Sequence, residues 1–461
     1  MLEVARVKGS AFPLVLRRLG AGLAGVSLVL TAACSGSGAD TTGAEGDSGG
    51  GDPVEVQISP EDGATEVRPD LPITVTAANG TITDVQVTQS GGESDAQNGP
   101  EGETGASEGE EGGEEEAGDA FDAITGTLNE DETEWTSDWT LTPGSQVTVT
   151  ATAENEGGEE TEVVSEFSTL AATAGQRLEL QSNFPVSDDT VGVGMPVIVN
   201  FDLPVQNKAA VEAAMEVTSE QPAEGAWNWF GDQMVVFRPK EYWEPNQKVT
   251  VNMHLAGVQA SEGVYGVENH QLDFEVGRSQ ISTIDSDTHR MTVERDGEQV
   301  QDFPTSIGKA TTRAYTTTSG THLTMEKYQH LVMDSATVGI PEGHPEYYKL
   351  DVNYAVRFSN SGEFTHAAPW NGQLGEANLS HGCPNLSTED AKWFYENSYM
   401  GDPLVITGTD RELEVDNGWG YWQRSWDEWL SNSEVGEADK TDEAGSPGSP
   451  FGEAGESGET E

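Results

Sequence analysis

A cysteine and two histidines lie close together late in the chain, in the segments FTHAAPW and SHGCPN. A cysteine acts as a nucleophile in its thiolate form, which a nearby base or a helix N-terminus favours. His381 stands two positions before Cys383 and would share its side of an extended segment. His366 comes from a separate segment, as the base of a nucleophile–base pair commonly does. The sequence therefore predicts a Cys383 nucleophile, with His366 favoured over His381 as its base.

The residues next to Cys383 also predict how a substrate carbonyl could be held. Gly382 has no side chain, so a carbonyl could approach the backbone N–H groups around Cys383, as an oxyanion hole requires. Pro384 lacks an N–H but leaves that of Cys383 intact. The segment STEDAKWFYEN predicts a helix capped by Ser387 or Thr388, and its positive end could face the thiol.

A structural cysteine and a zinc site are the alternative interpretations of these residues. A lone cysteine often serves as a small buried hydrophobic residue. His366, His381 and Cys383 could ligate zinc, but there is no second thiol and no spaced pair of ligands nearby. We therefore expect no metal. The remaining histidines receive no role: positions 254, 270, 289, 322, 330 and 344.

The other cysteine, Cys34, follows a basic stretch and the apolar run LGAGLAGVSLVLTAA. This run has signal-peptide length and is short for a membrane span. It resembles a bacterial lipoprotein signal, although Thr31 stands where leucine is usual and Leu30 is one place further out. We predict a signal over 1–33, lipidation of Cys34 and a flexible linker over 34–53, with ordinary secretion after Ala33 as the alternative. Cys383 would then be a free thiol outside the cell.

The charge of the chain excludes one large class of partners. It has 22 Lys+Arg against 81 Asp+Glu, a formal net charge of −59. Nucleic acid would be repelled by this surface, so we expect no nucleic-acid partner. The acidity fits either a well-solvated surface or a salty exterior, where ions screen the self-repulsion.

Short alternating runs with turn residues between them predict a mostly β chain ahead of the thiol. Runs such as VEVQIS and SQVTVTATA predict a β-sandwich over 54–170, with a disordered acidic insertion at about 91–119. Runs such as PVIVNFD and KVTVNMHL predict a second sandwich over 171–277, in which NKAAVEAAM is helix-like. No residue pattern in either sandwich indicates catalysis.

The part that carries Cys383 is predicted to be β-rich, with one main helix, over 278–411. The segment HRMTVERDGEQVQDFPTSIGK predicts a hairpin that turns at DGE. The tryptophan-rich segment over 412–432 is expected to dock on the preceding domains, with carbohydrate stacking as the alternative. The acidic tail over 433–461 is expected to be disordered.

The segment from His366 to Gly408 resembles the catalytic segment of the L,D-transpeptidases, bacterial wall enzymes of the YkuD type. Upstream, FPTSIGK, QHLVMDSATVGIP and NYAVRFSNSGEFTHAAPW are similar to the mycobacterial and actinobacterial branch, which also has Ig-like sandwiches ahead of the catalytic domain. The resemblance implies a cysteine acyltransferase that needs no cofactor. It forms a thioester with the third residue of a peptidoglycan tetrapeptide stem, releases D-Ala and joins the third residues of two stems. It also implies acylation of Cys383 by carbapenems.

The resemblance assigns roles residue by residue. Cys383 matches the nucleophile and His366 the base. Ser380, His381 and Gly382 match supporting motif positions. The positions matched to substrate contacts are Asn385, Tyr348, Ser361, Gly362 and Met333. Tyr347 is an equal alternative to Tyr348 by sequence, and Met333 could also be a core residue.

Three positions depart from close relatives. Ala367 stands where a serine is frequent; if the main-chain carbonyl there orients the imidazole, alanine suffices. Pro384 replaces an aliphatic residue and could stiffen the loop. Gln259 replaces an acidic calcium ligand, so we expect no calcium there.

Other activities remain open by sequence: an L,D-carboxypeptidase, transfer to a protein amine, or an inactive wall-binding scaffold lipoprotein. The expected location is the outer face of the cell membrane, anchored by lipid on Cys34 and reaching into the wall.

Overall fold

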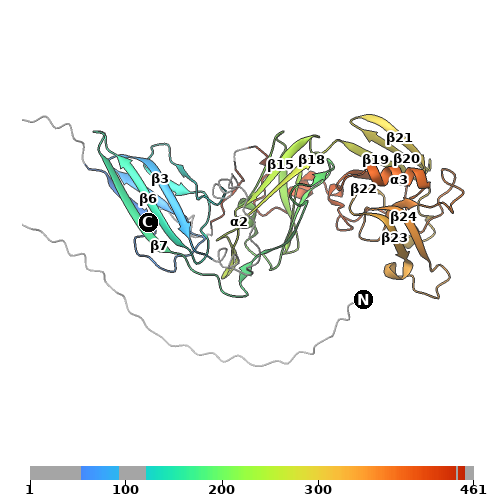
Figure 1. The fold of residues 1–461 in the computed structure, drawn as a ribbon, viewed down its shortest axis with the longest axis horizontal. Helices are drawn as coiled ribbons and strands as arrows, with labels where there is room; N and C mark the ends of the chain where they lie inside the picture. The colour runs from blue at the N-terminus through green and yellow to red at the C-terminus, as the bar shows by residue number, and fades with distance from the viewer. Residues whose placement is uncertain (1–52, 93–120, 443–444, 452–461) are drawn as a thin grey trace, which may run out of the picture. The chain divides into compact units, whose positions relative to one another are not determined.

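The computed structural model describes residues 53–92, 121–442 and 445–451, and its strands form three groups of sheets (Figure 1). The predicted signal, Cys34, nearly all of the linker and most of the acidic insertion lie outside the described residues. No helix within the described ranges combines the length and apolar character needed to cross a membrane.

The first group is a sandwich of two antiparallel sheets. Alternate side chains of β6 point into the core, as its alternating sequence QVTVTATAE predicts. One sheet has the order β1 (Glu55–Ser59), β2 (Thr74–Ala78), β5 (Glu134–Ser137), β4 (Gly126–Leu128). The other has the order β3 (Thr81–Ser90), β6 (Gln146–Glu154), β7 (Glu160–Ser168).

The second group is also a sandwich, and its core contains several fully buried aromatic side chains. One sheet has the order β10 (Thr190–Val191), β18 (His270–Val276), β15 (Gln247–Met253), β12 (Met215–Ser219). The facing sheet has the order β28 (Asp439–Lys440), β13 (Glu224–Phe230), β14 (Met234–Pro239), β11 (Val197–Phe201), β9 (Leu180–Phe184). A small sheet has the order β16 (Gln259–Ser261), β17 (Val264–Gly266), β8 (Arg177–Leu178). The helix-like segment is α2 (Lys208–Ala213).

The third group carries the thiol and contains two sheets. The predicted hairpin is confirmed: its turn residues Asp296 and Gly297 have φ of 51° and 81°, as a two-residue turn of this kind requires. One sheet has the order β21 (Glu298–Pro304), β20 (Arg290–Arg295), β19 (Gln280–Asp285), β27 (Pro403–Thr407), β22 (Gly320–Leu323). The other has the order β23 (Lys327–Asp334), β24 (Lys349–Arg357), β25 (Phe364–Ala367), β26 (Asn385–Leu386). Short 3-10 helices η1 (Arg313–Tyr315) and η2 (Ser335–Val338) connect strands, and η3 (Tyr421–Gln423) lies in the C-terminal segment after β27.

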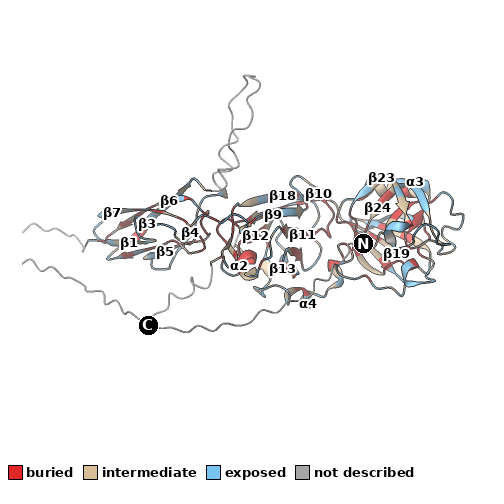
Figure 2. Cartoon of the chain, turned by 90° about the horizontal axis from the view of Figure 1, so that it is seen from below, coloured by how far each residue is buried: buried red, intermediate tan, exposed pale blue. Residues whose placement is uncertain are grey.

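The predicted helix is α3 (Thr388–Asn397), and it holds the segment after the thiol in place. The Ser387 side chain caps it by accepting a hydrogen bond from Asp390 N at 3.1 Å. Ala391 and Phe394 are buried in the same apolar core as Leu386 and Ala367. Figure 2 colours the buried parts of the chain red. The Ser387 cap and the apolar packing of Leu386 therefore hold the residues that follow Cys383 in place.

The aromatic C-terminal segment packs on the second sandwich. Trp429 in α4 (Trp426–Leu430) is fully buried with Val236, and its Nε1 donates to Ala226 O at 2.9 Å. The Arg238 guanidinium lies over the rings of Trp422 and Trp429, each at 4.6 Å from the ring centroid.

The tail from Ser433 is not wholly disordered, contrary to the expectation. The buried Glu212 carboxylate accepts hydrogen bonds from Ser433 Oγ at 2.6 Å and from Glu434 N at 2.8 Å. Beyond them, β28 pairs with the edge of β13, Lys440 opposite Glu224. A buried acceptor and an open sheet edge therefore order a segment whose composition alone indicated disorder. Residues 443–444 and 452–461 lie outside the description.

Candidate active site

An open cavity of about 410 Å³ lies where β23, β24, β25 and the Cys383 turn meet. The sequence-predicted residues that line it are Met333, Tyr348, His366, Ser380, His381, Cys383 and Asn385. Gly382, Ser361 and Gly362 do not line it. The structure thus gathers residues from four separate segments around one thiol.

Cys383 is partly exposed and lines the cavity. Sγ lies 3.8 Å from the Gly362 carbonyl oxygen. Burial raises the pKa of the thiol to about 12; the Phe364 N–H opposes this shift and the Glu363 charge adds to it. The sequence suggested that a helix N-terminus could favour the Cys383 thiolate; the thiol pKa is instead raised, because burial has the larger effect. The resting thiol is therefore protonated at neutral pH and needs a base.

His366 on β25 is placed beside Asn385 by the parallel pairing of β25 with β26. Its Nδ1 lies 2.9 Å from the Ala367 carbonyl oxygen, which can only accept, so Nδ1 carries the proton. This contact is the main-chain interaction that alanine can supply as well as serine. Burial lowers the pKa of His366, so the ring is neutral at pH 7 and Nε2 is the unprotonated nitrogen, as a general base needs.

Asn385 connects the base to the nucleophile turn. Its amide nitrogen lies 3.2 Å from His366 Nε2 and 3.2 Å from the Cys383 carbonyl oxygen. Asn371 donates to Asn385 Oδ1 at 3.3 Å, which fixes the orientation of that amide. Asn385 was expected from the sequence to contact substrate; in the structure it contacts the base as well. No motif in the sequence pointed to Asn371.

His381 makes polar contacts that set it apart from His366. Its Nε2 lies 2.8 Å from Glu346 Oε2, which also accepts from Lys309 Nζ at 2.7 Å. The hydrogen bonds from Lys309 and then from His381 lower the pKa of Glu346 to about 2. The His381 ring packs edge-on to Tyr315, at 4.7 Å between centroids. With Nε2 directed to Glu346, His381 is the weaker candidate for the base.

Tyr348, rather than Tyr347, lines the cavity. Burial raises the pKa of Tyr348 to about 12, so its hydroxyl stays protonated and can donate a hydrogen bond. The cavity is also lined by three exposed apolar side chains that no sequence motif indicated: Leu350, Trp370 and Leu379. Burying their apolar surface would stabilise the binding of a ligand that covers them.

The backbone around Cys383 has one unused donor. Gly382 N donates to Ser380 Oγ at 3.1 Å, whereas the Cys383 N–H has no hydrogen bond within the described part of the chain. Gly382 has φ of 135°, a conformation that side-chain-bearing residues rarely adopt. A substrate oxygen could therefore accept a hydrogen bond from the Cys383 N–H.

Ser361 faces away from the cavity. Its Oγ donates to Glu363 Oε2 at 2.7 Å, and its backbone N donates to Asn417 Oδ1 at 2.8 Å. Neither Glu363 nor Asn417 was singled out from the sequence, because Asn417 binds Ser361 from 56 positions away and Glu363 also has distant partners, Thr318 and Arg411.

The ring nitrogens of His366 and His381 have different partners, so these histidines do not converge with Cys383 as zinc ligands would. Across the described residues, no group of three or more histidine, cysteine or acidic side chains is placed to hold a metal ion.

Comparisons with known proteins identify the families that this chain matches. Residues 279–406 match the family model of the L,D-transpeptidase catalytic domain, and residues 115–259 match a bacterial Ig domain. L,D-transpeptidase 2 of Mycobacterium tuberculosis is 32% identical over 381 residues, which are 82% of this chain and 85% of the relative. L,D-transpeptidase 5 of the same species is 32% identical over 384 residues, 82% of this chain and 76% of the relative. A solved LD transpeptidase in complex with imipenem is 34% identical and covers 50% of this chain and 98% of its own, with a TM-score of 0.43.

Proposed function

Because this chain belongs to the L,D-transpeptidase family, we propose that it crosslinks peptidoglycan stem peptides through a thioester on Cys383. The donor is a tetrapeptide stem, and the product joins the third residues of two stems. The observation that carries the proposal is the neutral His366, oriented by the Ala367 carbonyl in the cavity that Cys383 lines.

The first half-reaction acylates the thiol. His366 Nε2 takes the proton from Cys383 as the sulfur attacks the carbonyl carbon of the third residue. The developing oxyanion accepts hydrogen bonds from the Cys383 N–H and from the Tyr348 hydroxyl. The C–N bond to D-Ala breaks, and the leaving amine takes the proton held on His366. Because thiol and imidazole are both neutral at rest, proton transfer accompanies attack.

The second half-reaction transfers the acyl group. The side-chain amine of a diaminopimelate on a second stem attacks the thioester, and His366 takes a proton from that amine. A C–N bond forms, the C–S bond breaks, and the sulfur recovers the proton. If water attacks instead, the product is a shortened stem, as in a carboxypeptidase. Carbapenems would acylate the same sulfur.

The location forms part of the proposal. Lipid on Cys34 would hold the enzyme at the outer face of the cell membrane, and the two sandwiches would carry the catalytic domain toward the wall. Labelling of the expressed protein with a radioactive fatty acid, lost in Cys34→Ala, tests the anchor. Labelling that persists in that variant would contradict it.

The catalytic proposal is tested by incubating the full chain with purified disaccharide-tetrapeptide and identifying the products by mass spectrometry. We expect release of D-Ala and a dimer joined at third residues, both absent in Cys383→Ala. Release of D-Ala without dimer would indicate a carboxypeptidase. Unchanged substrate with a folded protein would indicate a non-catalytic wall-binding scaffold.

A further inference from the structure

Glu363 is a buried carboxylate that the proposed mechanism does not use. It lies between Gly362, whose carbonyl faces the thiol, and Phe364, the first residue of β25. Only 4% of its surface is exposed. Burying a carboxylate is unfavourable unless several donors surround it, so such a residue calls for a physical reason.

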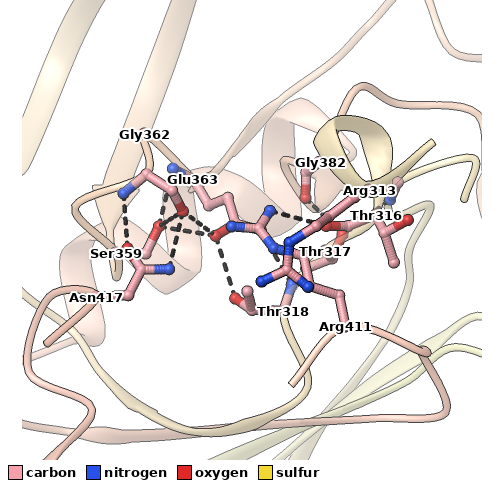
Figure 3. Close-up of polar contacts among 12 residues, drawn as sticks. Arg313, Thr316, Thr317, Thr318, Ser359, Gly362, Glu363, Gly382, Arg411 and Asn417 are labelled. Carbon is pink, nitrogen blue, oxygen red and sulfur yellow. Dashed lines mark hydrogen bonds and ion pairs between the residues drawn. The ribbon is translucent and has the colours of Figure 1, made fainter. Parts of the chain in front are cut away.

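The donors around Glu363 come from three separate loops (Figure 3). Oε1 accepts from Thr318 N at 3.0 Å, and Arg411 Nη1 lies 3.9 Å from it. Oε2 accepts from Ser359 Oγ at 2.8 Å and from Ser361 Oγ at 2.7 Å. The carboxylate thus ties together the loops before β22, before β25 and after β27.

Two of these loops hold the backbone on either side of the thiol. Next to Thr318, Thr317 Oγ1 donates to the Gly382 carbonyl oxygen at 2.5 Å. A Cβ added to Gly382 would lie 3.8 Å from Glu363 Cγ, so the Cys383 turn passes next to the Glu363 side chain. On the other side, Ser361 leads into Gly362, whose oxygen lies 3.8 Å from the sulfur.

We propose that Glu363 is a positioning residue for Cys383, holding Gly362 and Gly382, the backbone neighbours of the sulfur, at fixed positions. The inference rests on the proposed function of Cys383 as the nucleophile. The negative charge of Glu363 has a second effect, because a negative group near a thiol disfavours the thiolate. Glu363 indeed raises the pKa of Cys383, in addition to burial.

The other charged and titratable groups near this network are few within the described residues. Arg411, after β27, is the cation that faces Glu363. On β22, His322 Nε2 lies 2.7 Å from Thr318 Oγ1, and burial lowers its pKa to about 4, so it is neutral at pH 7. The groups that share the cavity with Cys383 are Tyr348, His366 and His381.

The test replaces Glu363 by glutamine in the full chain, which removes the charge but keeps an acceptor for Thr318 N. The readout is the rate at which iodoacetamide alkylates Cys383 between pH 6 and 10, followed on the Cys383 peptide by mass spectrometry. We expect E363Q to react about threefold faster or more at each pH, as a lower thiol pKa requires. In D-Ala release, we expect kcat to fall about tenfold with little change in KM.

A matched control is Glu212→Gln in the second sandwich. Glu212 is a buried carboxylate that likewise accepts from a hydroxyl and from backbone N–H groups, but it lies on α2 in the second sandwich and not in the domain that carries the thiol. We expect E212Q to leave both the alkylation profile and kcat unchanged. Glu363→Asp keeps the charge and is the second variant if E363Q does not fold; it should keep the alkylation rate of the unaltered protein.

Three results would overturn the inference: equal alkylation and kcat in E363Q and the unaltered protein, equal changes in E212Q, or faster alkylation in E363D. Alkylation does not depend on a peptide substrate. Faster alkylation of E363Q would therefore support the inference even if the unaltered protein released no D-Ala, a result that would refute the proposed function alone.

Discussion

In the folded protein, Cys383 should react with iodoacetamide more slowly than the same cysteine in the unfolded chain. Burial raises its thiol pKa from 9.0 to about 12, which lowers the thiolate fraction near neutral pH by about 10³. A thiolate of higher pKa is more nucleophilic, with a Brønsted slope of about 0.4–0.5, which restores a factor of roughly 15–30. The net expectation is a reaction roughly 30- to 60-fold slower in the folded state.

The assay compares the Cys383 peptide in native buffer and in concentrated urea, by quenched alkylation and mass spectrometry between pH 6 and 10. In the folded protein the rate should rise about tenfold for each step of one in pH throughout this range. In urea it should level off above about pH 9. A plateau below pH 7, with faster reaction in the folded protein, would refute this reasoning. That result would mean that Cys383 and His366 form a thiolate–imidazolium pair at rest.

Three further substitutions test separate parts of the structure. Asn385→Ala removes the amide between His366 and the Cys383 carbonyl and should lower kcat for D-Ala release by about 10- to 100-fold; an unchanged kcat would show that this amide does not orient the base. Ser387→Ala removes the cap of α3 and should lower the free energy of unfolding by about 1 kcal/mol, measured in urea, and no loss would contradict the capping role. Trp429→Ala should lower it by about 3–5 kcal/mol, with kcat retained, because this buried ring packs on the second sandwich and not in the cavity; a loss under 1 kcal/mol would count against that packing.

The sequence predicted local structure where one short segment determines its own conformation. The hairpin at Asp296–Gly297 and the cap at Ser387 depend on a few neighbouring residues, so both could be recognised. The ordered conformation of the segment that begins at Ser433 could not be recognised, because it depends on the buried carboxylate of Glu212, 221 positions earlier in the chain.

The same distinction holds for the candidate site. The cysteine, the histidine and the motif between them carry a signal in their spacing, and the structure brings them to one cavity. Glu346 and Glu363 carry no such signal, because acidic residues are abundant in this chain and most of them are solvated. Only the tertiary contacts separate these two from the others, through Lys309 for Glu346 and through Thr318 for Glu363.

The pairing of β25 with β26 also limits how this protein can change in evolution. His366 stands opposite Asn385 in a ladder only two residues long, which Ser306 extends on the other side. An inserted or deleted residue between Cys383 and Ser387 would shift that register and turn the catalytic side chains to the wrong face. The segment 369–379 enters no ladder; its Asn371 holds the Asn385 amide, but other residues that line the cavity, such as Trp370 and Gln373, can vary. Substrate preference can therefore diverge through that segment while the chemistry stays fixed.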